Sequence, residues 1–207
     1  MLQPGRFERA AWSRSANSGE SVLRKLIFVL ALGLPLAAWA LVKPVRTIAP
    51  ELEGLTCADR VCVDDAARRA EALALYREAS AFVQASVGTL EELPRAVFCS
   101  THECSEKFGA TRAHAYTVGT FAIVIGDRAW RPYYVRHELI HHLQNERLGS
   151  LRNWLFKPVW FREGMAYSLS QDPRDPLPEP LQSYRARFNA WFEVVGPEEL
   201  WAQAQRL

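Results

Sequence analysis

The chain has 207 residues, of which 49% are hydrophobic and 23% are charged, and its formal net charge is +2 at pH 7. This length supports one well-buried core with a small appendage, but not two full domains. The weak net charge argues against nucleic acid as a partner. The sequence also has no Lys/Arg-rich stripe with interleaved aromatic residues, which nucleic-acid binding would favour.

An uncharged run of 17 residues, 26–42, dominates the N-terminal part of the chain. About 17 residues is the lower limit for a helix that crosses the hydrocarbon core of a bilayer. A small-x-small pattern at 38–40 favours a cleavable signal peptide, whereas the long basic leader favours a retained signal-anchor helix. Because positive flanks stay in the cytoplasm, residues 1–25 are placed there and the rest of the chain outside. This predicts an inner-membrane protein with a periplasmic domain, or a secreted protein if the run is removed.

The four cysteines form two pairs of equal spacing, Cys57/Cys62 and Cys99/Cys104. An even number in an exported domain predicts disulfides, and pairing within each local pair is the simplest of the three possible arrangements. A four-cysteine structural zinc site is the competing interpretation. It is less favoured because its usual spacing is Cys-x2-Cys and because an oxidising compartment disfavours free thiolates.

Apolar periodicity and Gly or Pro punctuation predict the remaining elements. We expect a linker at 43–56 and a single domain at 57–207. Within the domain, the expected elements are a helix at 64–87, a strand at 95–99, a short helix at 103–108, a strand or hairpin at 115–125, a helix at 132–148, a loop at 150–159, a helix at 161–170, a Pro-rich loop at 172–180, and helical segments at 181–194 and from 197. This order predicts an α+β fold in which a small sheet packs against helices.

The string His137-Glu138-Leu139-Ile140-His141 lies inside the helix expected at 132–148. Residues four apart on an α-helix are only about 40° apart around its axis, so both imidazoles project from one face. Two nitrogens at this spacing can bind one Zn²⁺. Glu138 cannot easily join the same ligand pair, but it can reach a water on the open side of the metal, where a general base is needed.

Catalytic zinc usually has three protein ligands, so a further ligand is expected downstream. Glu163 stands among apolar residues near the start of the next helix, in the string WFREGMAY. A lone acid at a helix N-terminus is often only a favourable dipole contact. Here, however, the small residues Gly164 and Ala166 would permit close packing against the metal helix, which favours Glu163 as the third ligand.

The strings HELIHH and WFREGMA together resemble the gluzincin metallopeptidases. The resemblance covers about 40 residues, roughly 132–171. It implies a zincin-like sheet, zinc ligands at His137, His141 and Glu163, and a catalytic base at Glu138. It also implies that the strand at 117–125 borders the cleft and could bind an extended peptide by strand addition.

The sequence departs from some gluzincins, in which an acid four residues after the ligand Glu orients a ligand histidine. Here that position is Tyr167, so the histidines must be oriented by another group, such as a backbone carbonyl or Asp172. A developing oxyanion requires a donor, for which Tyr167, Tyr184 and Arg187 are the candidates.

Two other histidines are weaker candidates for metal binding. His142 lies about 100° around the helix from His141, so it points away from the shared metal of the pair. His114 precedes a strand and is interpreted as an ordinary polar residue.

Together these features predict zinc-dependent hydrolysis of peptide bonds by an exported, membrane-anchored metallopeptidase acting on a peptide or protein. Two alternatives remain open: a non-catalytic, zinc-stabilised binding or assembly protein of the cell envelope, and a zinc amidase acting on cell-wall material. Glu138 favours an enzyme, because a purely structural site has no use for an unligated base beside its ligands.

Overall fold

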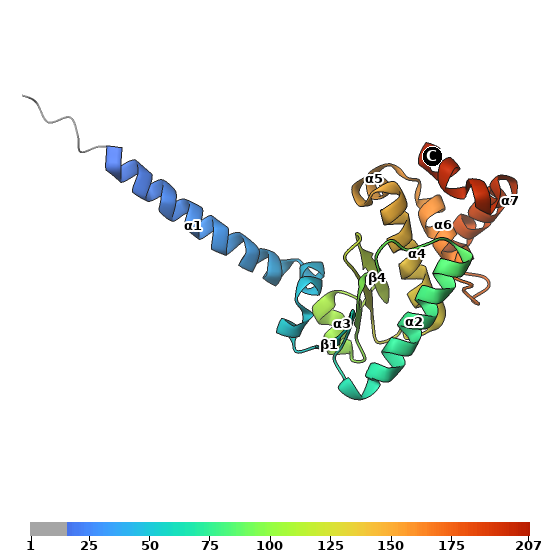
Figure 1. The fold of residues 1–207 in the computed structure, drawn as a ribbon, viewed down its shortest axis with the longest axis horizontal. Helices are drawn as coiled ribbons and strands as arrows, with labels where there is room; N and C mark the ends of the chain where they lie inside the picture. The colour runs from blue at the N-terminus through green and yellow to red at the C-terminus, as the bar shows by residue number, and fades with distance from the viewer. Residues whose placement is uncertain (1–15) are drawn as a thin grey trace, which may run out of the picture. The chain divides into compact units, whose positions relative to one another are not determined.

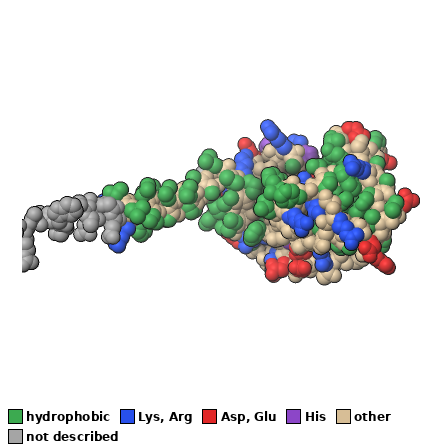
Figure 2. Space-filling view, turned by 90° about the horizontal axis from the view of Figure 1, so that it is seen from above, with side chains coloured by type: hydrophobic (Ala, Val, Ile, Leu, Met, Phe, Trp, Pro, Cys, Tyr) green, Lys and Arg blue, Asp and Glu red, His purple; other side chains and the backbone are tan. Residues whose placement is uncertain are grey.

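The computed structural model describes residues 16–207, which fall into two compact units that divide after Val42. In the first unit, helix α1 (Ala16–Leu41) contains a candidate membrane span, Val22–Trp39, with a mean hydropathy of 1.8. Figure 2 shows apolar side chains along this helix, and they are not buried within the structure. Signal sequences have the same length and composition, so α1 is compatible with a membrane-anchored or a secreted protein.

The second unit, Lys43–Leu207, is a mixed α+β domain built on a five-stranded sheet (Figure 1). Its strands are β1 (Thr56–Ala58), β2 (Val61–Val63), β3 (Arg95–Phe98), β4 (Ala115–Val118) and β5 (Ala122–Ile125). Its helices are η1 (Lys43–Ile48), η2 (Pro50–Glu53), η3 (Ala66–Arg68), α2 (Arg69–Ser86), α3 (His102–Phe108), α4 (Pro132–Leu148), α5 (Ser150–Phe156), α6 (Val159–Leu169) and α7 (Leu181–Arg206).

The strand order is β1-β2-β3-β5-β4, so β4 is an edge strand. Strands β2, β3 and β5 run parallel, whereas β1 and β4 pair antiparallel with their neighbours. The central strands are apolar on both faces, as expected for strands covered by helices on each side.

Successive side chains of a strand point to opposite faces of the sheet, so they pack into two separate hydrophobic cores, one on each face. Phe98 and Ile123 belong to the larger core, together with residues from α2, α4, α6 and α7. Val97 and Val124 point to the opposite face, where Phe108 of α3 covers them. The sheet therefore separates a large helical layer, which carries the functional site, from a small layer around α3.

Most predicted elements are present in the structure, and the expected helix at 132–148 coincides with α4. The region at 115–125 is a hairpin, and 161–170 corresponds closely to α6. Three expectations differ from the structure. Residues 43–56 contain η1 and η2 and belong to the domain rather than forming a separate linker. Strands β1 and β2 were not predicted, because three-residue strands carry almost no periodic signal. The loop expected at 150–159 contains α5.

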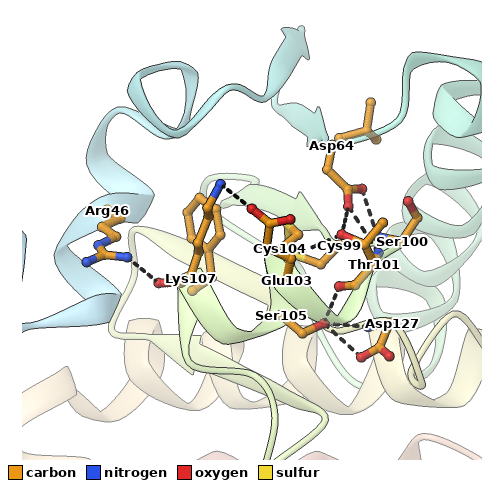
Figure 3. The surroundings of a disulfide bond; sticks show 12 residues. Arg46, Asp64, Cys99, Ser100, Thr101, Glu103, Cys104, Ser105, Lys107 and Asp127 are labelled. Carbon is orange, nitrogen blue, oxygen red and sulfur yellow. Dashed lines mark hydrogen bonds and ion pairs between the residues drawn. A yellow bond between two sulfur atoms is a disulfide. The ribbon is translucent and has the colours of Figure 1, made fainter.

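Both disulfides join the local pairs, Cys57–Cys62 and Cys99–Cys104, as predicted. Figure 3 shows the surroundings of the second bond, where Asp64 at the end of β2 faces the segment after β3. The Asp64 carboxylate accepts hydrogen bonds from the backbone N–H groups of Ser100 (2.7 Å) and Thr101 (3.0 Å). Asp64 therefore ties β2 to the start of α3, while the next residue, Asp65, caps η3 by accepting a hydrogen bond from the backbone N–H of Ala67.

Replacing Asp64 by Asn should destabilise the domain by about 1–2 kcal/mol, because an amide offers one acceptor where two backbone donors point. Burial opposes ionisation of Asp64, but these hydrogen bonds prevail and lower its pKa. The contribution is therefore present above the unfolded-state pKa of about 4 and is lost as the pH falls through the folded-state value. Chemical denaturation at pH 7 and pH 3 should show the difference between the two proteins shrinking in acid. Asp59→Asn, at an exposed turn position, is the matched control and should be neutral at both pH values.

Candidate metal centre

Helix α4 presents His137 and His141 on one face, as the four-residue spacing predicts. The helix starts with Pro132, whose missing N–H costs nothing in the first turn, and ends before Gly149 in a positive-φ conformation. The two Nε2 atoms face each other 3.1 Å apart. His137 is buried and His141 is half-buried, so little water competes for these nitrogens.

Glu163 of α6 completes a three-residue group that can hold a metal ion. Its two carboxylate oxygens lie 3.7 Å from His137 Nε2 and 3.7 Å from His141 Nε2. Ligands on a tetrahedral zinc ion at about 2.0–2.1 Å are separated from one another by roughly 3.3 Å. The two 3.7 Å distances involve different oxygens of Glu163, but one ligand atom from each of the three residues lies within 4.8 Å of the other two, so the group is close enough to share one metal ion. A second group, Glu51 with Cys57 and Cys62, offers no thiolate because its sulfurs form a disulfide.

Gly164 holds the ligand helix in place, but through α7 rather than through the metal helix as the sequence analysis expected. A Cβ atom at this position would lie 2.3 Å from the Tyr184 carbonyl oxygen and 2.7 Å from Phe188 Cβ, both on α7. Only glycine permits this approach of two backbones. The expectation was wrong about the partner, because a sequence shows that a residue is small but not which neighbour requires it.

Gln144 orients His141, a role that the sequence did not reveal. Its side-chain nitrogen donates to the Arg162 carbonyl (3.0 Å), so its oxygen must be the atom 3.0 Å from His141 Nδ1. The N–H at His141 Nδ1 therefore donates a hydrogen bond to the Gln144 side-chain oxygen, which leaves Nε2 as the nitrogen that can bind a metal. Because Arg162 directly precedes Glu163, this buried amide also joins α4 to the ligand helix.

The pKa values of the ligands in the metal-free protein follow from burial and mutual charge. Burial opposes protonation of His141, but the Glu163 carboxylate outweighs it and raises the pKa of His141 to about 9. Burial, followed by repulsion from His141, lowers the pKa of His137 to about 3. Burial opposes ionisation of Glu163, but His141 prevails and lowers its pKa to about 2. At neutral pH, the metal-free site therefore contains an ion pair between His141 and Glu163.

Glu138 is buried beside the ligands but points to a different partner. Its Oε2 lies 2.7 Å from the hydroxyl of Thr117 on β4, and that hydroxyl also lies 2.9 Å from the Glu138 carbonyl oxygen. Burial raises the pKa of Glu138 to about 7, against the opposing effects of His141 and Thr117. A carboxyl group with this pKa can both accept and release a proton near neutral pH.

A cleft of about 850 Å³ contains all four predicted site residues of the metal motif. The residues of β4 form one wall, and α5 and the start of α6 contribute to another. Tyr167 also lines the cleft, and its ring lies 4.4 Å from the ring of His137, centroid to centroid. The structure thus brings together His137, Glu138, His141, Glu163 and Tyr167.

Tyr134 and Arg174 also line the cleft, and sequence analysis missed both. The Arg174 guanidinium pairs with the buried carboxylate of Asp172 (Nη2 to Oδ2, 2.5 Å) and lies 3.1 Å from the Tyr134 hydroxyl. It also lies over the Tyr167 ring at 5.8 Å. Tyr134 could have been inferred from its position one helical turn before His137, but Arg174 stands in a Pro-rich loop without a motif.

Of the other candidates, His142, Tyr184 and Arg187 lie outside the cleft, whereas His114 lines it. His142 is fully buried and bonds to the Glu92 carbonyl (2.8 Å) and Glu146 (3.0 Å), so it points away from the metal group as predicted, although it is not a surface residue. Tyr184 and Arg187 do not line the cleft, and Arg187 stacks on Trp160 instead. His114 lines the cleft rim.

Comparison of the chain with protein-family models, with curated proteins and with solved structures finds no match. The chemistry of the site is therefore argued from its geometry.

Replacing Glu163 by Ala should weaken binding of Zn²⁺, used as the probe, by more than the 10–100-fold typical of losing a residue that only orients a ligand. The variant removes one of three ligand groups and leaves His141 without its charge partner. Calorimetric titration of the metal-free protein measures the affinity. Glu193→Ala, an exposed acid on α7, is the control and should bind as the wild type does. Equal affinities for both variants would remove Glu163 from the site.

Metal affinity should rise with pH, because the ion must displace the proton that His141 carries below its pKa of about 9. The expected slope is about tenfold per pH unit between pH 6 and 8. Titrations in buffers of different ionisation enthalpy should show close to one proton released per ion at pH 7. An affinity that stays constant across this range would contradict the proposed ion pair.

Proposed function

We propose that the protein is a zinc-dependent metallopeptidase that hydrolyses peptide bonds in the cleft between β4 and α5. The observation that carries this proposal is the position of Glu138, an unligated, buried carboxylate beside a three-ligand metal group. When bound, zinc polarises a scissile carbonyl and makes water nucleophilic near neutral pH. Zinc is favoured over harder ions because two of the three donors are imidazole nitrogens.

In this proposal Glu138 is the general base. Its raised pKa allows it to take a proton from the attacking water and return it to the leaving amine. Thr117 positions Glu138 through the hydrogen bond to its carboxylate, so the base keeps one orientation in the cleft. The hydroxyl has a single proton, so the Glu138 carbonyl oxygen is its alternative acceptor, and Thr117 contacts both the base and the backbone of α4.

The edge strand β4 is suited to hold an extended peptide. It pairs only with β5 in the sheet order of the described chain, and Ala115, Tyr116 and Thr117 line the cleft. A peptide that adds to this edge would align its backbone along the metal group. This supports a polypeptide substrate over a small ligand and agrees with the expectation that the strand borders the cleft.

A donor to the developing oxyanion is provided by Tyr167 in this proposal. Burial raises the pKa of Tyr167 to about 12, so its hydroxyl remains protonated and can donate. Arg174 above the ring adds a positive charge on the same side of the cleft. The gluzincin resemblance of the sequence is part of this proposal, and the third ligand that it implies, Glu163, lies on the helix that follows the short α5.

Replacing Glu138 by Gln should leave the zinc content unchanged and lower the hydrolysis rate by about 10²–10⁴-fold, the usual contribution of a general base. Full-length protein in detergent, incubated with a peptide library, allows cleavage to be measured by mass spectrometry, with metal content determined in parallel. Glu193→Gln is the matched control and should retain full activity.

Each result separates the proposal from its alternatives. A wild-type protein that contains zinc but cleaves no peptide would favour the zinc-stabilised assembly protein. Cleavage of cell-wall fragments without cleavage of any peptide would favour the amidase. Loss of zinc from Glu138→Gln would mean that Glu138 acts as a ligand rather than as a base.

A further inference from the structure

Helix α5 has an inverted distribution of polarity for a helix of a globular domain. Its buried residue is the polar Asn153, whereas Leu151, Trp154, Leu155 and Phe156 are exposed, Trp154 by 67% and Phe156 by 71%. Contiguous apolar surface of this kind is rare on a soluble monomer and marks contact with another apolar phase or partner.

The apolar surface extends beyond α5 to the β4–β5 turn. Phe121 of this turn is 77% exposed. Asn145 donates to the carbonyl of Gly119 in the turn (2.9 Å) and accepts from Asn153 of α5 (2.9 Å). The turn and α5 are therefore held side by side, and we call Phe121 together with Leu151, Trp154, Leu155 and Phe156 the α5 patch.

The first residue of the domain lies close to the end of α3. This residue, Lys43, lies against Gly109. The carbonyl of Phe108, one residue earlier, accepts a hydrogen bond from Tyr116 of β4. Strand β4 leads directly to the turn that contains Gly119, so a short series of contacts connects the first residue of the domain to the α5 patch.

The connection to the candidate membrane span is short. The span ends at Trp39, and only residues 40–42 precede Lys43. The domain of a chain that retains α1 is thereby confined to within a few residues of the bilayer.

The charge around α5 also fits a bilayer. From 147 to 162, between Glu146 and Glu163, the sequence contains four basic residues and no acidic one; Lys157 is buried, Arg147 and Arg162 are half-buried, and Arg152 is exposed. Arg152 is exposed on α5 itself, and exposed Arg112 lies across the same cleft. A short helix with Trp, Phe and Leu on its exposed face and cationic residues beside them has the composition of an interfacial membrane helix.

We propose that the α5 patch inserts into the interface of an anionic lipid bilayer and holds the domain against the membrane. Leu151 and Trp154 belong both to the patch and to the lining of the cleft. The cleft therefore opens next to the lipid surface, and the polypeptides it can reach are those at the membrane. Membrane contact does not depend on the proposed peptidase activity and can be tested without it.

The test measures lipid contact at single positions. All four native cysteines are in disulfides, so one introduced cysteine can be labelled selectively. Full-length Phe156→Cys carries an environment-sensitive fluorophore and is reconstituted into phosphatidylcholine–phosphatidylglycerol vesicles, with or without nitroxide groups on the acyl chains. Val194→Cys, on an α7 position that is 87% exposed, is the matched control.

The proposal expects nitroxide lipids to quench the label at 156 by at least about twofold more than the label at 194. Leu155→Cys repeats the measurement at a second position of the patch and should behave like 156. Equal quenching at 156 and 194 would overturn the proposal. A label at 156 that is protected from water but not quenched by nitroxide lipids would also overturn the proposal. If that protection depends on protein concentration, the patch binds a second copy of the chain. If it appears only with added peptide, the patch is a substrate surface.

Discussion

The functional site depends on the convergence of two helices, α4 and α6, on one point. Helix α4 supplies two imidazoles by its own periodicity, but the third ligand has to come from α6. Its position is set by α7, whose backbone approaches Gly164 so closely that any side chain there would collide with the Tyr184 carbonyl. The position of Glu163 is thus set by the contact of the neighbouring Gly164 with the backbone of α7.

Hydrogen bonds from two neighbouring polar side chains then hold His141 and Glu138 in position. Gln144 joins His141 to the segment that carries Glu163. Thr117 joins Glu138 to the edge strand that borders the cleft. Both contacts are hydrogen bonds in a poorly solvated environment, where an unmatched polar group would be costly. In the proposed enzyme, these contacts would hold the metal ligands and the base in one orientation, as catalysis by positioning requires.

The edge strand β4 connects the chemistry to the surroundings of the domain. One of its residues holds Glu138, another bonds to the α3 end near Lys43, and the turn after it supports α5. If the α5 patch lies in the membrane interface, the short strand β4 and its turn contact the membrane-bound helix, the cleft and the proposed base. The proposed base and the proposed membrane surface are then parts of one rigid assembly rather than independent features.

The sequence by itself determined the elements whose signal is local. The helix with His137, Glu138 and His141, the hairpin around Gly119 and the two local disulfides follow from periodicity, turn chemistry and spacing, because each involves residues close together in the chain. Strands β1 and β2, by contrast, are too short to carry a period and exist through their pairing with β3.

Only the tertiary structure decided which distant residues join the site. Gln144, Thr117, Tyr134 and Arg174 belong to no motif, and folding joins each of them to a residue from another part of the chain, Gln144 to Arg162 of α6. The exposed face of α5 could not be recognised in advance either, because apolar residues predict burial and only the folded domain shows that they remain uncovered. Local sequence fixes the periodicity of a helix, whereas the partner of each of its faces is set by packing against the rest of the chain.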